Sequence, residues 1–134
     1  MKLLLDTNGY VGFKMGNSEI VEYLVQAENI FISPIVLGEL MFGFLNGNRF
    51  QENMIELKRF INHEAVEEIQ IGDVTADRYS RIAMQLKRQG TPIPSNDIWI
   101  AAQTMEYGAE LVTMDRHFEK ITGLVYRYFS FPNI

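Results

Sequence analysis

The sequence contains no cysteine and only two histidines, His63 and His117. Without thiols, the chain has no disulfide framework, no thiolate nucleophile and no cysteine-based zinc site. Two histidines are also too few for a histidine-rich transition-metal centre. Both lie in polar stretches of the sequence, so we expect them to be surface residues. Any metal bound by this chain is therefore expected to be a hard cation held by carboxylates.

Long apolar runs are absent as well. No stretch approaches the roughly 20 apolar residues that a membrane-spanning helix needs. The N-terminus has the pattern of a core strand that starts at residue 3, and it lacks the basic segment and small-residue cleavage site of a signal peptide. These absences predict a cytoplasmic protein.

An excess of positive charge is also missing. The chain has 12 Lys and Arg residues against 17 Asp and Glu residues, a net charge of −5. This balance argues against a protein that binds nucleic acid through bulk electrostatics. Divalent ions bound by some of the acids would reverse the local charge where a phosphate must lie. We therefore expect weak non-specific affinity for nucleic acid.

The 134 residues, of which 47% are hydrophobic, predict a single domain over residues 1–134 with a substantial core. No internal repeat, low-complexity tract or linker divides the chain. Strands are expected at residues 3–5, 30–32, 66–71, 111–113 and 124–128, and helices at 18–27, 34–45, 49–62, 73–89 and about 96–107. This alternation predicts an α/β sandwich with a mostly parallel central sheet.

Helix starts can be assigned from capping residues. Ser18 is expected to cap the first predicted helix, and Ser33 followed by Pro34 is expected to open the second. Either Ser95 or Asn96 is expected to cap the last one. In a parallel sheet with helices of this kind, ligands bind at the carboxyl ends of the strands. Polar residues just after strands are therefore the first candidates for a functional site.

Four acidic residues stand where a lone carboxylate would be costly. Asp6 ends the first strand, Asp115 follows a later strand, and Asp97 lies at the start of a helix. Glu39 is the only charge in the apolar run 31–44. An unpaired carboxylate out of water costs several kcal/mol, and four together repel one another unless cations lie between them. The set predicts a Mg²⁺ or Mn²⁺ site and, with it, phosphodiester chemistry.

Each acid also has a purely structural explanation when taken singly. Asp6 could satisfy loop amides in a turn, and Asp115 could cap a short helical turn over residues 116–120. Asp97 could simply interact with the positive end of its helix dipole. Glu39 is the hardest to explain in this way, because its neighbours leave little polar surface. The joint arrangement carries the prediction of a metal site.

Other polar residues could support such a site. Asn8 and Thr113 are candidates for orienting the metal ligands from behind, although Asn8 could equally cap a turn and Thr113 could equally complete a strand. Asn96, beside Asp97, is similarly open to both explanations. A row of arginines at helical spacing is either a solvated face or a contact to RNA phosphates; it comprises Arg78, Arg81 and Arg88.

Four segments of the chain resemble the acidic motifs of PIN-domain ribonucleases. They are Leu4-Leu5-Asp6-Thr7-Asn8, residues 33–40 around Glu39, residues 93–102 around Asp97, and Leu111-Val112-Thr113-Met114-Asp115. Among these ribonucleases the chain is most similar to VapC-type toxins of prokaryotic toxin–antitoxin pairs, whose usual tail resembles residues 117–124. The order and separation of the motifs make the resemblance specific.

This resemblance implies a PIN-like three-layer sandwich and a Mg²⁺- or Mn²⁺-dependent endoribonuclease. It implies that Asp6, Glu39, Asp97 and Asp115 form the catalytic and metal-binding set. We expect Asp6 and Asp97 to be direct ligands, and Glu39 and Asp115 to bind through water or a second ion. The resemblance also implies a homodimer, RNA as substrate, and a small cognate antitoxin that inhibits the enzyme. An arginine or lysine from the antitoxin could enter the acidic cleft in place of the cation.

Three other functions are compatible with parts of the pattern. Phosphoryl transfer through an aspartyl phosphate normally requires a second aspartate two residues after the first, and this position is Asn8. A receiver-like signalling domain would carry paired acids at the first strand and a later lysine, and we find neither. A PIN-like module that binds RNA or protein without catalysis would be expected to have lost one of the acids. Retention of all four favours an enzyme.

Overall fold

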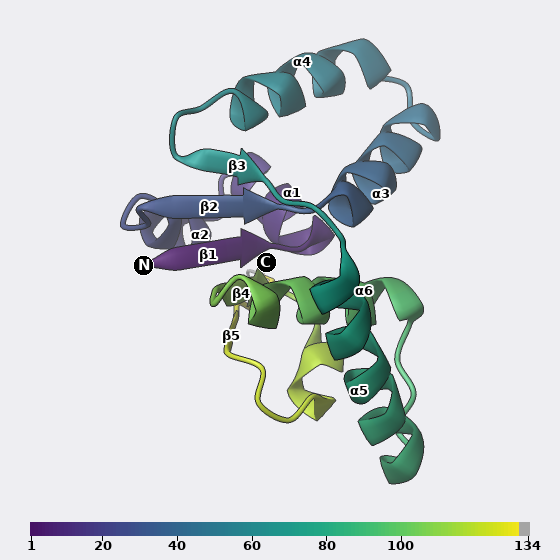
Figure 1. Cartoon of the computed structure of the whole chain (residues 1–134). Coiled ribbons are helices and arrows are strands. Elements are labelled where there is room, and N and C mark those ends of the chain that lie inside the picture. Colours follow the sequence, from purple (N-terminus) through teal and green to yellow (C-terminus); the bar gives the residue numbers. More distant parts are fainter. Residues whose placement is uncertain (132–134) are drawn as a thin grey trace.

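A five-stranded parallel sheet between two layers of helices forms the centre of the molecule (Figure 1). The computed structural model describes residues 1–131. The elements are β1 (Lys2–Leu5), α1 (Thr7–Lys14), α2 (Ser18–Leu24), β2 (Asn29–Ile32), α3 (Pro34–Leu45), α4 (Phe50–Ile61), β3 (Val66–Glu68), α5 (Asp73–Gln89), α6 (Ser95–Glu106), β4 (Glu110–Thr113), the 3₁₀ helix η1 (Arg116–Lys120) and β5 (Tyr126–Tyr128). In Figure 1, α1 and α2 lie behind the sheet and α6 lies in front of it. The predicted α/β sandwich with a parallel central sheet is confirmed.

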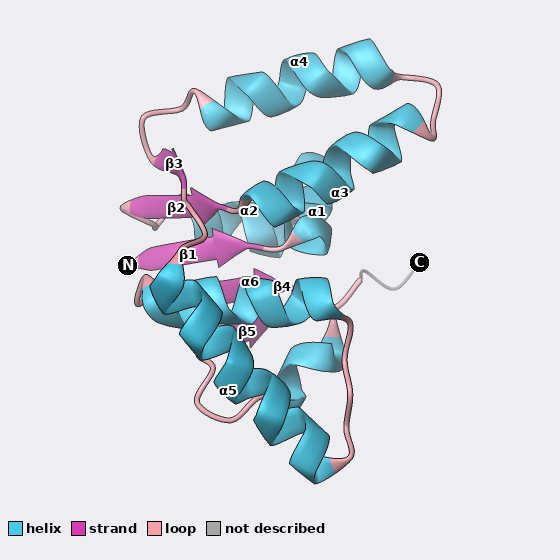
Figure 2. Ribbon diagram, turned by 45° about the vertical axis from the view of Figure 1, so that its right-hand side comes forward, coloured by secondary structure: helices cyan, strands magenta, loops and turns pink. Residues whose placement is uncertain are grey.

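Strand β1 occupies the middle of the sheet. The strand order is β3-β2-β1-β4-β5, and β1 pairs in parallel with both β2 and β4. Leu3, Leu4 and Leu5 are fully buried, as expected for a central strand covered on both faces. The arrowheads of β1, β2 and β4 point the same way in Figure 2. Residues that follow these strands therefore meet at one edge of the sheet.

Three helices begin in ways that position this edge. The Asp6 side chain caps α1, a helix that the sequence analysis did not predict, by accepting a hydrogen bond from the backbone N–H of Gly9. Ser33 caps α3 with Pro34 in its first turn, as predicted. Helix α6 begins after Pro94 without a side-chain cap, so the predicted cap at Ser95 or Asn96 is wrong. Both residues instead lie inside the first turn.

Gly9 allows α1 to pack closely against the sheet. A β-carbon at this position would lie 2.6 Å from the carbonyl oxygen of Val112 on β4, and 3.0 Å from Oδ1 of Asp6. No real β-carbon approaches a backbone oxygen this closely, so only glycine fits without moving α1. The position of Asp6 thus depends on a residue that lacks a side chain.

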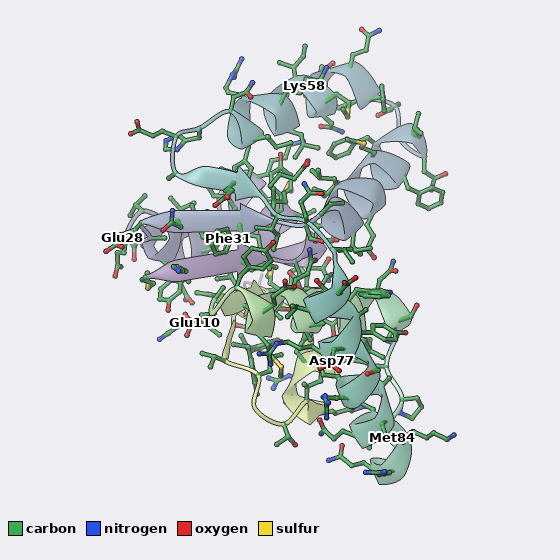
Figure 3. All side chains as sticks on the ribbon, viewed as in Figure 1. Glu28, Phe31, Lys58, Asp77, Met84 and Glu110 are labelled. Atoms are coloured by element: carbon green, nitrogen blue, oxygen red, sulfur yellow. The ribbon has the colours of Figure 1, made fainter. Side chains whose placement is uncertain are left out.

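Aromatic contacts fix the outer helices to the core. The Phe60 ring of α4 lies 5.2 Å from the ring of Tyr10 and 5.5 Å from that of Phe13, both on α1. On the opposite side, Phe31 lies 5.6 Å from Tyr107 at the end of α6. Figure 3 shows Phe31 at the centre of the molecule, whereas Lys58 lies on the outer surface of α4. Such ring pairs stabilise a fold beyond the area that they bury.

Several predicted boundaries shift by a few residues. Helix α2 is capped by Asn17 in place of Ser18, and it ends at Leu24. Strand β3 stops at Glu68, because the chain then turns toward α5. Within residues 1–131, no helix combines the length and the apolar character that crossing a bilayer requires.

Candidate active site

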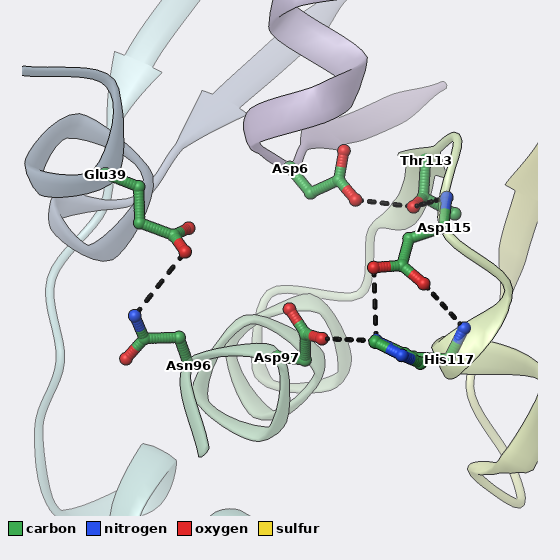
Figure 4. A network of polar contacts seen from close by, with 7 residues as sticks. All are labelled: Asp6, Glu39, Asn96, Asp97, Thr113, Asp115 and His117. Atoms are coloured by element: carbon green, nitrogen blue, oxygen red, sulfur yellow. Dashed lines mark hydrogen bonds and ion pairs between the residues drawn. The ribbon is translucent and has the colours of Figure 1, made fainter. Parts of the chain in front are cut away.

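Four acidic side chains line one pocket at the carboxyl edge of the sheet (Figure 4). Asp6 follows β1, Asp115 lies two residues beyond β4, Asp97 stands in the first turn of α6, and Glu39 projects from the second turn of α3. Strands β1 and β4 pair with Leu5 opposite Val112, which brings the first two acids to the same edge. The pocket has a volume of about 400 Å³. The structure thus brings together all four acids singled out from the sequence.

Asp6 is the most deeply buried of the four, with 4% of its surface exposed. Its Oδ1 accepts a hydrogen bond from the backbone N–H of Gly9 at 2.7 Å, and its Oδ2 accepts one from the hydroxyl of Thr113. Burial raises the pKa of Asp6 from 3.8 to about 7, and the charges of Asp97 and Asp115 act in the same direction. The two hydrogen bonds lower the pKa without offsetting the burial. This carboxylate therefore lacks a countercharge.

Thr113 connects two of the acids. The same hydroxyl that donates to Asp6 accepts a hydrogen bond from the backbone N–H of Asp115 at 2.9 Å. Thr113 is fully buried at the end of β4, so its hydroxyl has little freedom to move. Thr113 was predicted as a supporting residue, and its side chain contacts the carboxylate of Asp6.

Asp97 and Asp115 face each other across the pocket. Burial raises the pKa of Asp97 above its ordinary value, and the charges of Asp115 and Glu39 raise it further. His117 acts in the opposite direction, as a hydrogen-bonding partner of Asp97. Asp115 also caps η1, because its Oδ1 accepts a hydrogen bond from the backbone N–H of His117 at 2.8 Å. The predicted capping role of Asp115 is thus observed, and the same side chain lines the pocket.

Glu39 is held at the other side of the pocket. Its Oε1 accepts a hydrogen bond from the hydroxyl of Thr7 at 2.6 Å, and its Oε2 lies 3.5 Å from the amide nitrogen of Asn96. This contact with Thr7 was not predicted from the sequence, in which the adjacent Asn8 was the candidate supporting residue. Asn8 is exposed and lines the pocket, and within residues 1–131 no hydrogen bond joins its side chain to an acid of the site.

His117 was expected to be a surface residue, and its exposure agrees with this, but it also lines the acidic pocket. Its side chain is 45% exposed, but Nδ1 lies 3.1 Å from Oδ2 of Asp97 and 3.1 Å from Oδ2 of Asp115. The physical reason is the tight 3₁₀ turn of η1, which brings the side chain back over the pocket. The sequence carries no signal for this contact, because it joins His117 to Asp97 on a distant element.

The chemistry of the pocket suits a divalent cation. Carboxylate oxygens are the ligands that Mg²⁺ and Mn²⁺ prefer, and a cation among several carboxylates reduces the repulsion between them. Asp97, Asp115 and His117 each offer one ligand atom, and these three atoms lie within 4.8 Å of one another. The raised pKa of Asp6 is a further sign that the carboxylates lack a partner of opposite charge.

Comparison with known proteins agrees with this geometry. The sequence matches the family model of the PIN domain over residues 3–124. It is 28% identical over 130 residues to ribonuclease VapC1 of Haemophilus influenzae, covering 92% of this chain and 95% of that protein. It is also 28% identical over 127 residues to the tRNA(fMet)-specific endonuclease VapC of Salmonella typhimurium, covering 92% of this chain and 95% of the relative.

Solved structures give the same result. The crystal structure of VapBC2 from Rickettsia felis, bound to a DNA fragment from its promoter, contains a chain with a TM-score of 0.84 to this protein. The two chains are 27% identical, and the match covers 97% of this chain and 100% of the other. The family match spans most of the chain, from β1 into the segment after η1. On these grounds, the chain belongs to the PIN domain family.

Proposed function

We propose that this chain is a metal-dependent endoribonuclease that hydrolyses RNA phosphodiester bonds and acts as the toxin of a toxin–antitoxin pair. The observation that carries the proposal is the convergence of Asp6, Glu39, Asp97 and Asp115 on one pocket. Membership of the PIN domain family and the likeness to proteins named ribonuclease VapC support RNA as the substrate. Such an enzyme would work in the cytoplasm, where its substrate is.

The four acids are assigned as the residues that hold Mg²⁺ or Mn²⁺. Asp6 and Asp97 are proposed as direct ligands, because burial raises the pKa of each and so increases the gain from a nearby cation. Glu39 and Asp115 are proposed to bind through water or to hold a second ion. The bound ion would supply Lewis acidity, lowering the pKa of an attacking water and neutralising charge on the phosphate.

The chain's own contribution is to orient these acids. The hydroxyl of Thr113 and the backbone N–H of Gly9 occupy one lone pair on each oxygen of Asp6 and so fix its rotation. Thr7 and Asn96 do the same for Glu39 from opposite sides. Supporting hydrogen bonds of this kind are commonly worth 10–100-fold in metal affinity (a rough range). Water is the nucleophile in this proposal, so no side chain has to attack the phosphate.

The partner is proposed to be a small antitoxin, because structural relatives include complexes of the VapBC type. A groove of about 520 Å³, separate from the acidic pocket, offers an apolar surface for a segment of such a partner. It runs between α1, α2 and α4, and Val25 on its wall is 76% exposed. A basic residue of the same partner could reach the acidic pocket and exclude the cation.

A homodimer is proposed on a different surface. Phe42 and Leu45 on α3 are 72% and 68% exposed, and Ile55 on α4 is 57% exposed. Exposed apolar side chains grouped on neighbouring helices are typical of protein–protein contacts. Phe44 on the same helix faces the core instead, with 9% exposure. The proposed interface therefore consists of the outward-facing residues of α3 and α4.

A PIN-like module that binds RNA or protein without catalysis is the alternative. It would not need four carboxylates in one pocket, nor the hydrogen bonds that orient them. Purified protein incubated with total RNA distinguishes the two functions. We expect discrete fragments with Mn²⁺ or Mg²⁺, and none with EDTA or in Asp97→Asn.

The matched control is Asp77→Asn. Asp77 is an exposed acid on α5 that pairs with Arg81, away from the pocket. The Asp77→Asn variant should cleave RNA as the unmodified chain does. RNA binding without cleavage under every metal condition would favour the binding module, and full activity in Asp97→Asn would contradict the assignment of the site.

A further inference from the structure

The imidazole of His117 lies where it could bind a cation together with the carboxylates of Asp97 and Asp115. Its Nδ1 stands 3.1 Å from one oxygen of Asp97 and 3.1 Å from one oxygen of Asp115 (Figure 4). These three atoms come from α6, from the loop after β4 and from η1, so they are brought together by the fold and not by local sequence alone.

The imidazole nitrogen is equally far from the two carboxylate oxygens, and this geometry suits a shared cation better than a hydrogen bond. Both carboxylate oxygens can only accept, and the imidazole nitrogen presents either a lone pair or a single N–H. One N–H points along one line and serves two oxygens poorly, whereas one cation can be shared by all three atoms. Adjacent ligands of an octahedral ion with bonds of about 2.1 Å lie roughly 3 Å apart. The observed spacing of 3.1 Å is close to this value.

The backbone holds His117 in this position. Its N–H donates to Oδ1 of Asp115 at 2.8 Å, which leaves Oδ2 of that residue directed at the imidazole. The next residue, Phe118, is fully buried, and Ile121 at the end of the turn is 3% exposed. These two apolar side chains anchor η1 to the core, so the imidazole is positioned before any ion binds.

We propose that His117 is a ligand of the second ion that Asp115 was proposed to hold, supplying a nitrogen beside the carboxylates of Asp97 and Asp115, and that it makes this ion site prefer Mn²⁺ to Mg²⁺. Mg²⁺ is bound almost entirely by oxygen, whereas an imidazole nitrogen suits first-row transition metals better. The inference rests on the metal-dependent function proposed above and extends it to the choice of metal.

Electron spin echo spectroscopy of the Mn²⁺-loaded protein tests the contact directly, because it detects a nitrogen bonded to the ion. We expect ¹⁴N modulation typical of imidazole in the unmodified chain. Labelling histidine alone with ¹⁵N should change the pattern. In His117→Gln we expect Mn²⁺ to bind without this modulation. The ratio of Mn²⁺ to Mg²⁺ affinity, measured by calorimetry, should fall about tenfold.

His63→Gln is the matched control. His63 is the only other histidine in the chain. Its Nδ1 accepts a hydrogen bond from the backbone N–H of Ala65, and the residue borders the apolar groove. This variant should keep both the nitrogen modulation and the metal preference.

The outcomes separate the two proposals. Mn²⁺ that binds the unmodified chain without nitrogen modulation would overturn the role of His117 while leaving the carboxylate site and the nuclease proposal intact. Modulation that persists in His117→Gln would also overturn it. Failure of the unmodified chain to bind Mn²⁺ or Mg²⁺ at all would overturn both the inference and the metal-dependent function.

Discussion

The hydroxyl of Thr113 donates a hydrogen bond to the buried carboxylate of Asp6, across the pairing of β1 with β4. It joins the first acid of the pocket to the strand that carries the last one. Because the same oxygen accepts from the backbone N–H of Asp115, a single buried hydroxyl sets the positions of two acids.

Removal of this hydroxyl should weaken the metal site without unfolding the protein. In Thr113→Val, Asp6 and the backbone of Asp115 each lose a partner, and we expect Mn²⁺ affinity to fall roughly 10–100-fold. Titration calorimetry measures this loss. Thr104→Val is the control, because Thr104 is also buried but donates only to Ile100 of its own helix. Restoring the hydroxyl with Thr113→Ser should recover most of the affinity; equal affinity in all three variants would contradict the role of Thr113.

The metal-free protein should lose stability as the pH rises from about 4 to about 7. The folded-state pKa of Asp6 is raised to about 7 from 3.8, so the folded state holds a proton that the unfolded state has released. This makes the unfolded state the weaker proton binder over that range, and the free energy of unfolding falls with pH until Asp6 is ionised in both states. Asp97 contributes in the same direction.

The variant Asp6→Asn removes the Asp6 part of this dependence. At pH 8 with EDTA, we expect it to be more stable than the unmodified chain by about 2–4 kcal/mol, because no buried charge remains. Urea unfolding at pH 5 and pH 8 measures the difference. The stabilisation given by Mn²⁺ should be lost in the same variant. An unchanged pH dependence in Asp6→Asn would show that its carboxylate is not the group responsible.

Replacing Gly9 should damage the site through the backbone. In Gly9→Ala the new β-carbon meets the carbonyl oxygen of Val112 and Oδ1 of Asp6, so α1 must move and the cap of Asp6 weakens. We expect a loss of about 1–3 kcal/mol in unfolding free energy and reduced Mn²⁺ affinity. Gly43→Ala is the control. It meets no atom within 4 Å in α3, and alanine there should be neutral or stabilising. If both variants behaved alike, the close approach at Gly9 would not matter.

The two proposed protein surfaces should be separable by mutation. Val25→Glu places a charge in the apolar groove between α1, α2 and α4, and we expect it to abolish co-purification with a co-expressed antitoxin while leaving the dimer intact. Phe42→Asp on the outer side of α3 should give the reverse result: a monomer that still binds the antitoxin. Sedimentation and pull-down measure the two properties, and loss of both in either variant would mean that the surfaces are not separate.

Much of the fold could be predicted from the sequence. The fully buried Leu3–Leu5 strand, the Ser33–Pro34 helix start and the helix Asp73–Gln89 all follow from local patterns of apolar residues, caps and glycine. Helix α1 was missed because its two glycines, Gly9 and Gly12, are poor helix formers that are present for close packing. Tertiary contact, not local preference, decides that segment.

Some residues of the site could likewise be predicted from the sequence, and others could not. Its four acids could be found because each lies within an apolar segment or directly before or after one, where a carboxylate is costly. Thr7 and His117 could not, because their roles depend on contacts with Glu39 and Asp97 from distant elements. A hydroxyl or an imidazole in a polar stretch has no unusual cost in sequence, so only the folded arrangement shows what it touches.

The placement of β1 beside β4 also governs when the pocket can exist. Asp6 emerges first during synthesis, while the Thr113 hydroxyl that holds it lies 107 positions later in the chain. A nascent or truncated chain that lacks β4 would have neither this contact nor Asp115, and its central strand would have no partner on one side. If these residues carry out the proposed cleavage, the chain would become able to attack RNA only after nearly all of it has been translated and folded.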